Sequence, residues 1–263
     1  MSADCSLAEC LQFFDDILTT LRSGFAAIED AAPKPIGRVR SGNFEVRYNE
    51  PTLELALVLK LARDISLLGA LRIMVERGLV QEQGILKRAI DETDEDILFL
   101  SFGRQTGIEQ LHNEFLDAFW AEEFDDPNNA QSAKRRKSVP RRKIQAYNSR
   151  ISGAGNPSTS QSISRQLQGV FSGFVHGAST HIMDMYDPKT GRFRTDGLND
   201  SPIRDSYTID SANYPYRVLM SAVMIARRLG LSNIADGFHR KVRESDSFVG
   251  LIDGKPNTGR SPT

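Results

Sequence analysis

The stretch over residues 53–77 has the pattern of one long helix that is apolar on nearly every side. Thr52 stands where it can cap this helix, and Gly78 stands where it can end it. A helix with so little polar surface is normally enclosed by other helices. It is not an ordinary membrane span, because charged residues recur along it at Lys60, Arg63, Asp64 and Arg72. We therefore expect this helix at the centre of an all-α bundle.

Apolar residues at helical spacing predict further helices along the chain. The expected ranges are about 6–30, 81–102, 107–124, 160–187, 211–229 and 232–245. The stretch NFEVRY alternates as a strand does, and RFRT is at best a brief strand, so we expect one short hairpin-like element at most. The pattern predicts a single helical domain over residues 1–263, a bundle of about seven helices.

Residues 125–160 differ in composition from the rest of the chain. They are polar, heavily charged and contain prolines, with only one short helical stretch, KIQAYNSRI. Such a composition cannot bury enough apolar surface to order itself, so we expect a mostly mobile basic insertion. The tail over residues 250–263 is expected to be disordered for the same reason.

Cys5 and Cys10 are the only cysteines, and they lie five positions apart in an N-terminal segment with a helical pattern. Five residues turn a helix by about 500°, so the two thiols face different sides and are not expected to pair. Free thiols are typical of a reducing compartment. The N-terminus lacks the basic and apolar segments of a signal peptide, so we expect a cytoplasmic protein without membrane association. Phosphate-binding glycine loops and zinc spacings are missing too, which predicts no cofactor.

The segment QGVFSGFVHGASTHIMDMYD, residues 168–187, carries Gly169, Gly173 and Gly177 at a spacing of four. Each glycine inside a helix costs about 1 kcal/mol relative to alanine. Close contact with a neighbouring helix would offset that cost, since the spacing places the glycines on one face. Ser172 and His176 share this face, and the imidazole could handle a proton or an anion there.

A second polar segment, KRAIDETDED, covers residues 87–96 and holds five acids within positions 91–96. These acids cannot all face solvent if the helix is packed on two sides. We expect one of Asp91, Glu92 or Glu95 to point inward and to pair with Arg88 or His176. The candidate ligand-binding pocket therefore comprises Arg88, Glu92, Ser172 and His176.

The run from Lys134 to Lys143 is the most basic part of the chain. It is either a solvated loop or a contact for the phosphate backbone of a nucleic acid. The candidate contacts are Lys134, Arg135, Arg136, Lys137, Arg141, Arg142 and Lys143. The net charge of −1 argues against a surface built wholly for nucleic acid. Within the run, RRKSV is also a short match to the substrates of basophilic kinases.

With the Arg88-x-x-x-Glu92 helix and the Ser172-Gly-Phe-Val-His176-Gly motif placed, residues 50–187 resemble uncharacterised helical bacterial proteins near the HEPN-like bundles. HEPN ribonucleases are all-α, dimeric toxins or defence effectors that cleave RNA without metal, using an Arg and a His four to six residues apart. The resemblance implies Arg104 and His112 as catalytic residues, although seven residues separate them here. It also implies a homodimer.

A di-metal carboxylate bundle is a further alternative for an all-α fold. Such sites need Glu-x-x-His on two helices and a glutamate on two others. Glu109-x-x-His112 and Asp236-x-x-His239 approximate the pattern, with Glu54 and Glu92 as additional ligands. We expect no metal, since short matches of this kind are common. The leading prediction is a binding or regulatory protein, in defence or stress, that recognises a small ligand or a protein partner.

Overall fold

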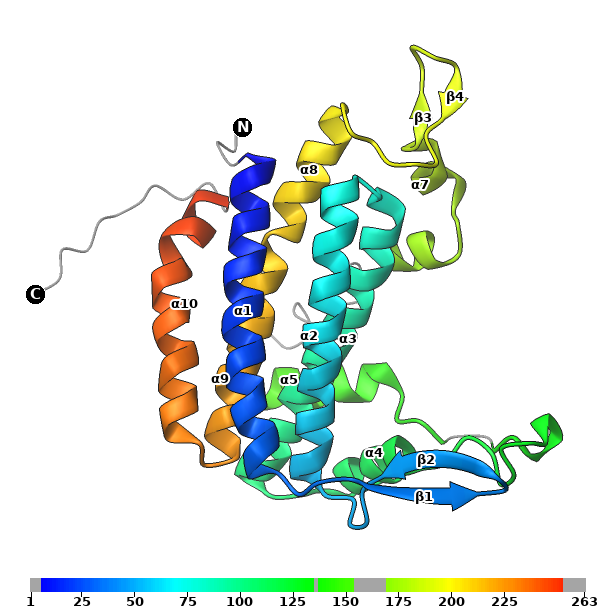
Figure 1. Ribbon diagram of the computed structural model, residues 1–263, viewed down its shortest axis with the longest axis vertical. Coiled ribbons are helices and arrows are strands. Elements are labelled where there is room, and N and C mark those ends of the chain that lie inside the picture. The colour runs from blue at the N-terminus through cyan, green and yellow to red at the C-terminus, as the bar shows by residue number, and fades with distance from the viewer. Residues whose placement is uncertain (1–5, 135–136, 154–168, 253–263) are drawn as a thin grey trace, which may run out of the picture.

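The structure, a computed structural model, describes residues 6–134, 137–153 and 169–252. Five long helices stand side by side and form the bundle (Figure 1). They are α1 (Leu7–Ala31), α2 (Leu53–Arg77), α3 (Val80–Thr106), α9 (Asn213–Arg228) and α10 (Ser232–Ile252). The predicted all-α class is confirmed. No helix in the described ranges is long and apolar enough to cross a membrane.

Local capping groups set the start of α1 and both ends of α2, and those of α2, Thr52 and Gly78, were predicted. Ser6 and Glu9 form a reciprocal capping box at the start of α1. Thr52 accepts a hydrogen bond from the amide of Leu55 at the start of α2. Gly78 ends α2 with φ +65°, a left-handed conformation that glycine adopts without strain. These local signals fix where two of the bundle helices begin or end.

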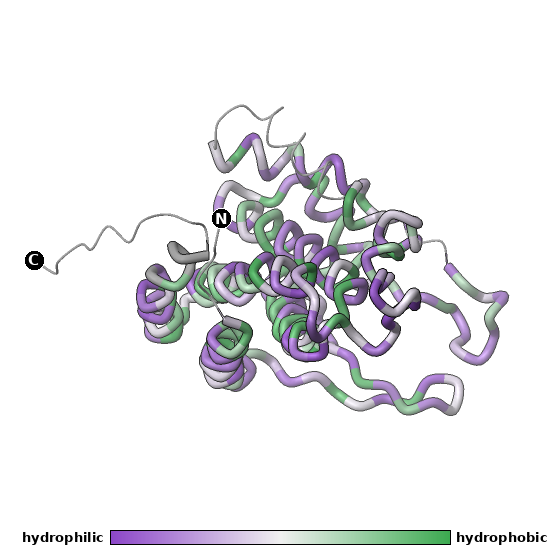
Figure 2. Tube along the Cα trace, turned by 90° about the horizontal axis from the view of Figure 1, so that it is seen from above, coloured by the Kyte–Doolittle hydropathy of each residue, from purple (hydrophilic) through white to green (hydrophobic). Residues whose placement is uncertain are grey.

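Helix α2 lies at the centre of the bundle, as its apolar sequence predicts. It buries residues on several sides and packs against α1, α3 and α9. Figure 2 shows hydrophobic residues concentrated toward the middle of the bundle, with hydrophilic ones on the outer sides of the outer helices. The buried side chains of α2 include Leu55, Leu57, Val58, Leu61, Leu68 and Leu71.

The predicted insertion contains the one short helix that its sequence indicated. After α4 (Gln110–Trp120), a bridge between Phe124 and Ala133 closes a loop that contains the short helix η1 (Ala130–Ser132). The stretch KIQAYNSRI then forms most of helix α5 (Arg141–Ser152), which packs against α3. Ile144 and Tyr147 hold α5 there because they bury apolar surface. Residues 135–136, 154–168 and 253–263 lie outside the described residues, as do the predictions made for them.

Two hairpins lie at opposite ends of the bundle (Figure 1). The larger joins β1 (Ile36–Arg40) to β2 (Asn43–Arg47), antiparallel, with Ile36 opposite Arg47. The smaller joins β3 (Tyr186–Asp187) to β4 (Arg192–Phe193). The alternation of NFEVRY therefore marks a real strand, and the second hairpin adds to the one that was expected.

The predicted continuous helix through residue 187 is interrupted. Residues 169–175 are helical, but Gly177 adopts φ +63° and a turn follows. The chain resumes in the short helix α7 (Ser179–Met183). Helix α8 (Pro202–Ser211), which Ser201 caps, precedes α9 and was not predicted. Gly177 is thus a helix-ending residue, not part of a helical glycine face.

Candidate functional site

The acid-rich part of α3 directs charged side chains toward three neighbouring helices. On the side of α2 and α5, the buried carboxylate of Asp96 binds two cations. Lys60 Nζ of α2 lies 2.7 Å from Asp96 Oδ2, and Arg141 of α5 contacts Oδ1. Arg141 also donates to the backbone carbonyl of Glu92, at 3.0 Å. Because both cations reach one carboxylate, Asp96 joins α2, α3 and α5.

On the side of α9, Asp91 and Asp94 share one guanidinium, that of Arg217. Ser221 donates to Asp94 Oδ1 at 2.6 Å, and Tyr214 donates to Asp91 at 3.4 Å. Burial raises the pKa of Asp91, and Arg217 acts to lower it. Two carboxylates and one cation leave an excess of negative charge between α3 and α9.

Asp64 of α2 completes this cluster from the opposite side. Its side chain is fully buried, and no N–H or O–H donor among the described residues reaches either carboxyl oxygen. Burial and the charge of Asp94 raise the pKa of Asp64 to about 9. The carboxyl of Asp64 is therefore protonated at neutral pH and donates its proton to Asp94. Burial raises the pKa of Asp94 as well, while Arg217 and Ser221 oppose that effect.

A third pair links α3 to α8. Lys87 is 1% exposed, and its Nζ lies 2.6 Å from Asp210 Oδ2. The ammonium also lies over the ring of Tyr207, 5.4 Å from its centroid. Burial lowers the pKa of Lys87, and Asp210 opposes that shift. The polar interior of the bundle is thus a set of specific ion pairs around α3.

The prediction that acids of α3 turn inward was right, and one of the predicted pairs forms, between Glu92 and Arg88 on the partly exposed side of α3. The other two acids have partners that were not predicted: Asp91 pairs with Arg217 and Glu95 with Arg141. These two cations come from α9 and α5.

The four predicted ligand-binding residues do not form one cluster among the described contacts. Arg88 and Glu92 pair with each other along α3, at 2.9 Å. His176 is exposed in the turn, and its amide donates to the carbonyl of Ser172. No side-chain hydrogen bond or ion pair of the described residues joins His176 to Arg88 or Glu92.

A close helix contact was expected at Gly169, Gly173 and Gly177, and the contact that forms depends mainly on Gly84 of α3. Phe174 packs against Gly84 of α3, where an added Cβ would lie 2.4 Å from the ring. Gly173 receives the ring of His181 in the same way. Gly169 meets nothing within 4 Å among the described residues. The glycine of α3, and not the four-residue repeat, sets how closely residues 169–175 approach.

The resemblance to HEPN-like proteins implies Arg104 and His112 as catalytic residues, but His112 lies in the core and Arg104 on the surface. His112 is fully buried, stacks on Phe99 and accepts a hydrogen bond at Nδ1 from the amide of Glu109. Burial lowers the pKa of His112. Arg104 is exposed and pairs with Glu54 at 3.0 Å. A histidine enclosed in this way cannot reach a substrate, so its role in the structure is packing and capping of α4.

The di-metal pattern is not assembled either. Glu109 and His112 form the capping box of α4, and His239 contacts Arg243 on α10. Across the part of the chain that the structure describes, no three His, Cys, Asp or Glu side chains are grouped as metal ligands are.

The basic run divides into internal and exposed cations. Lys134 pairs with Asp125, and Arg141 is held by Asp96. Lys137, Arg142 and Lys143 are exposed. Arg141 therefore has a structural role as the partner of Asp96, and Arg135 and Arg136 lie outside the described residues.

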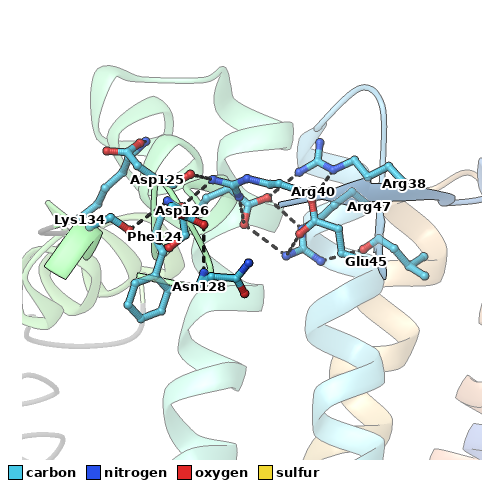
Figure 3. A network of polar contacts seen from close by, with 12 residues as sticks. Arg38, Arg40, Glu45, Arg47, Phe124, Asp125, Asp126, Asn128 and Lys134 are labelled. Atoms are coloured by element: carbon cyan, nitrogen blue, oxygen red, sulfur yellow. Dashed lines mark hydrogen bonds and ion pairs between the residues drawn. The ribbon is translucent and has the colours of Figure 1, made fainter. Parts of the chain in front are cut away.

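The exposed β1–β2 hairpin is fixed to the segment after α4 by a polar network (Figure 3). The carboxylate of Glu122 lies among three guanidiniums. It is 2.9 Å from Arg38, 3.0 Å from Arg47 and 3.5 Å from Arg40. Arg47 and its neighbours hold the pKa of Glu122 below its usual range. This network orients one face of the hairpin inward.

Further contacts hold the tip and one strand of the hairpin. Arg40 donates to the carbonyls of Phe124 and Asp125, and Asn128 donates to the carbonyl of Ser41. A cavity of about 380 Å³ lies between the hairpin and the end of α4. Its lining includes Arg40, Arg47, Glu122 and the ring of Trp120.

The opposite face of the hairpin is apolar and exposed. Val39 stands directly opposite Phe44, and they are 72% and 74% exposed. Val46 is opposite Gly37, and the ring of Phe44 covers that glycine. These side chains share one face because alternate residues of a strand point to the same side. The sequence predicted the strand here but not its exposure.

Comparison with models of known protein families, with curated proteins and with solved structures gives no match for this chain. The candidate site is therefore defined by its geometry alone. It consists of the rigid hairpin with its exposed apolar face, which we call the hairpin face: Gly37, Val39, Phe44 and Val46.

Proposed function

We propose that this protein is a binding protein that captures an extended acidic segment of a partner protein on its β1–β2 hairpin. The observation that supports this proposal is the hairpin face, on which large apolar side chains stand in solvent. The proposal keeps the binding role expected from the sequence and moves its site from the glycine helix to the hairpin.

The hairpin is suited to strand addition. A two-stranded sheet has unpaired edges, and an extended segment can add a third strand through backbone hydrogen bonds. Alternate side chains of that segment would cover Val39 and Phe44, burying apolar surface that is now exposed. Because Glu122 and Arg40 already fix the hairpin to the bundle, little conformational entropy would be lost on binding.

The charges of the hairpin favour an acidic partner. Among the side chains paired directly with Glu122 or Glu45, three arginines face these two glutamates, which leaves one more cation than carboxylate in this group. The side chains of Arg38 and Arg47 are each 44% exposed, so they can pair with acids of the added strand. A segment that alternates apolar and acidic residues would match both the hairpin face and these guanidiniums.

A displayed library of random twelve-residue peptides, selected on the purified full chain, tests the proposal. We expect enrichment of sequences that alternate apolar and acidic residues. A synthetic peptide of the enriched sequence should bind roughly tenfold or more weakly to the Val39→Ser, Phe44→Ser variant, because two apolar contacts are lost. Ile73→Ser is the matched control, since Ile73 is an exposed apolar residue of α2 away from the hairpin.

Three results would overturn the proposal. The first is a selection without enrichment. The second is a peptide that binds the hairpin variant and the control equally well. The third is a wild-type dimer in light scattering that the hairpin substitutions convert to monomer, because the hairpin face would then serve a second copy of the chain.

A further inference from the structure

Ser138 is exposed and lies outside helices and strands, in residues 137–140 before the start of α5. Four consecutive cations, residues 134–137, precede it directly in the sequence. A protein kinase binds its substrate serine in an extended, accessible segment, and an acidic kinase cleft selects basic residues on the N-terminal side. Ser138 thus meets the accessibility and charge requirements of such an enzyme, and it is not held in a helix or strand.

The surroundings of Ser138 can accommodate a phosphate. Ser138 lines a cavity of about 590 Å³ together with Lys134 and Lys137. Glu114 and Asp117 of α4 line the same cavity. The two lysines can therefore pair with an added dianion, while the two acids repel it and direct it toward the basic side of the cavity.

The start of α5 lacks the groups that normally stabilise the N-terminus of a helix. Its N-cap position is Pro140, which offers no side-chain hydrogen bond, and its first turn contains no acid. Instead the first turn carries Arg141, Arg142 and Lys143, cations at the positive end of the helix dipole. Only Arg141 is compensated by a buried acid, Asp96, among the ion pairs of the described residues. A negative charge just before this helix would correct the imbalance.

We propose that Ser138 is a phosphorylation site for a basophilic protein kinase and that its phosphate stabilises the start of α5. In the reaction, Ser138 Oγ attacks the γ-phosphorus of a nucleoside triphosphate. An Oγ–P bond forms, the bond from that phosphorus to the β–γ bridging oxygen breaks, and the hydroxyl proton passes to the base of the kinase. The products are phosphoserine 138 and a nucleoside diphosphate.

The phosphate changes the local ion pairs. It adds a charge of about −1.5 to −2 two residues before the N-cap of α5. Lys134, now paired with Asp125, gains a stronger competing partner. The attraction of the phosphate for the exposed Arg142 and Lys143 also offsets the unfavourable placement of these cations at the helix start. The first turn of α5 becomes more rigid, and α5 is held more firmly against α3.

The test incubates the purified full chain with ATP and a kinase that requires basic residues before its serine. Peptide mass spectrometry should find one phosphate, on Ser138, formed at least roughly tenfold faster than on any other serine. Ser138→Ala should remove it. Ser149→Ala is the matched control, because Ser149 lies on α5 without a basic run before it.

The second measurement is hydrogen exchange of the phosphorylated chain. Amides of residues 141–144 should exchange roughly threefold or more slowly than before phosphorylation, since the helix start is stabilised. Phosphate on other serines, no phosphate at all, or unchanged exchange at these amides would each overturn the proposal. The Ser138→Ala variant treated with the same kinase reports any effect of the enzyme itself.

Discussion

Replacing Asp64 by asparagine should make the stability of the protein less dependent on pH. Asparagine has the shape of a protonated aspartate, and its amide can still donate to Asp94. The wild-type carboxyl keeps its proton up to about pH 9 in the folded chain, whereas in the unfolded chain it releases it near pH 4. Between about pH 4 and pH 9, the wild-type chain therefore takes up a proton at Asp64 when it folds, and the Asp64→Asn variant does not.

The sign and size of the effect follow from that difference. Because the folded pKa is raised, the stabilisation by Asp64 is complete below pH 4 and is lost as pH rises toward 9. The loss amounts to about 1.4 kcal/mol for each pH unit. Between pH 5 and pH 8 the Asp64→Asn variant should thus gain about 4 kcal/mol relative to wild type, as an upper limit.

Urea unfolding at several pH values measures this quantity, with helical circular dichroism and the fluorescence of Trp120 as independent signals. The comparison is between variant and wild type at each pH, because groups that do not contact Asp64, such as His112, then contribute equally to both; the difference reports Asp64 together with its partner Asp94. Asp236→Asn, an exposed site on α10, controls for the chemical change itself. If the difference between Asp64→Asn and wild type is the same at pH 5 and pH 8, Asp64 is not protonated in the fold.

Three further predictions concern packing and the hairpin. Gly84→Ala should cost about 2 kcal/mol of unfolding free energy, because the new Cβ would overlap the ring of Phe174. His112→Ala should cost about 3 kcal/mol by leaving a cavity in the core, measured by the same urea unfolding. Glu122→Ala should make the amides of residues 36–47 exchange roughly tenfold faster, since the guanidiniums of the hairpin lose their shared carboxylate.

Matched variants make these outcomes decisive. Gly237→Ala on α10 places a methyl in open space and should not destabilise the chain, so equal costs at both glycines would contradict the packing argument. A stability of His112→Ala equal to wild type would contradict its core role. Glu114→Ala is the control for Glu122→Ala, because it removes an exposed acid of α4. If the amides of residues 36–47 exchange at the same rate in both variants, the network around Glu122 does not hold the hairpin.

The sequence predicted the fold class because local signals and periodicity agree over the long helices. Thr52, Gly78 and the capping box of Ser6 with Glu9 each act within one turn of a helix, so their effect can be seen in the sequence. The same reasoning failed at Gly177. A glycine inside an apolar pattern does not reveal whether it continues a helix or adopts a positive φ and ends it.

The partners of the buried acids could not be predicted in the same way. Five acids close together on a helix packed on two sides cannot all face solvent, so the sequence indicated that some acids of α3 point inward and need cationic partners, and this is what the structure has. Yet Arg217 follows Asp91 by more than a hundred positions, and only the packing of α9 on α3 brings them together. The hairpin face was missed because alternation shows that two faces differ, not which face is covered.

The ion pairs around α3 also restrict which substitutions the chain can accept. Asp96 meets α2 and α5, Asp94 meets α2 and α9, and Lys87 meets α8. Loss of the partner leaves Asp96 or Lys87 as an unpaired buried charge, so substitutions at the partner positions should be accompanied by a change at the buried residue. In diverging copies of this protein, Asp96 should therefore change together with Lys60 or Arg141, and Lys87 together with Asp210.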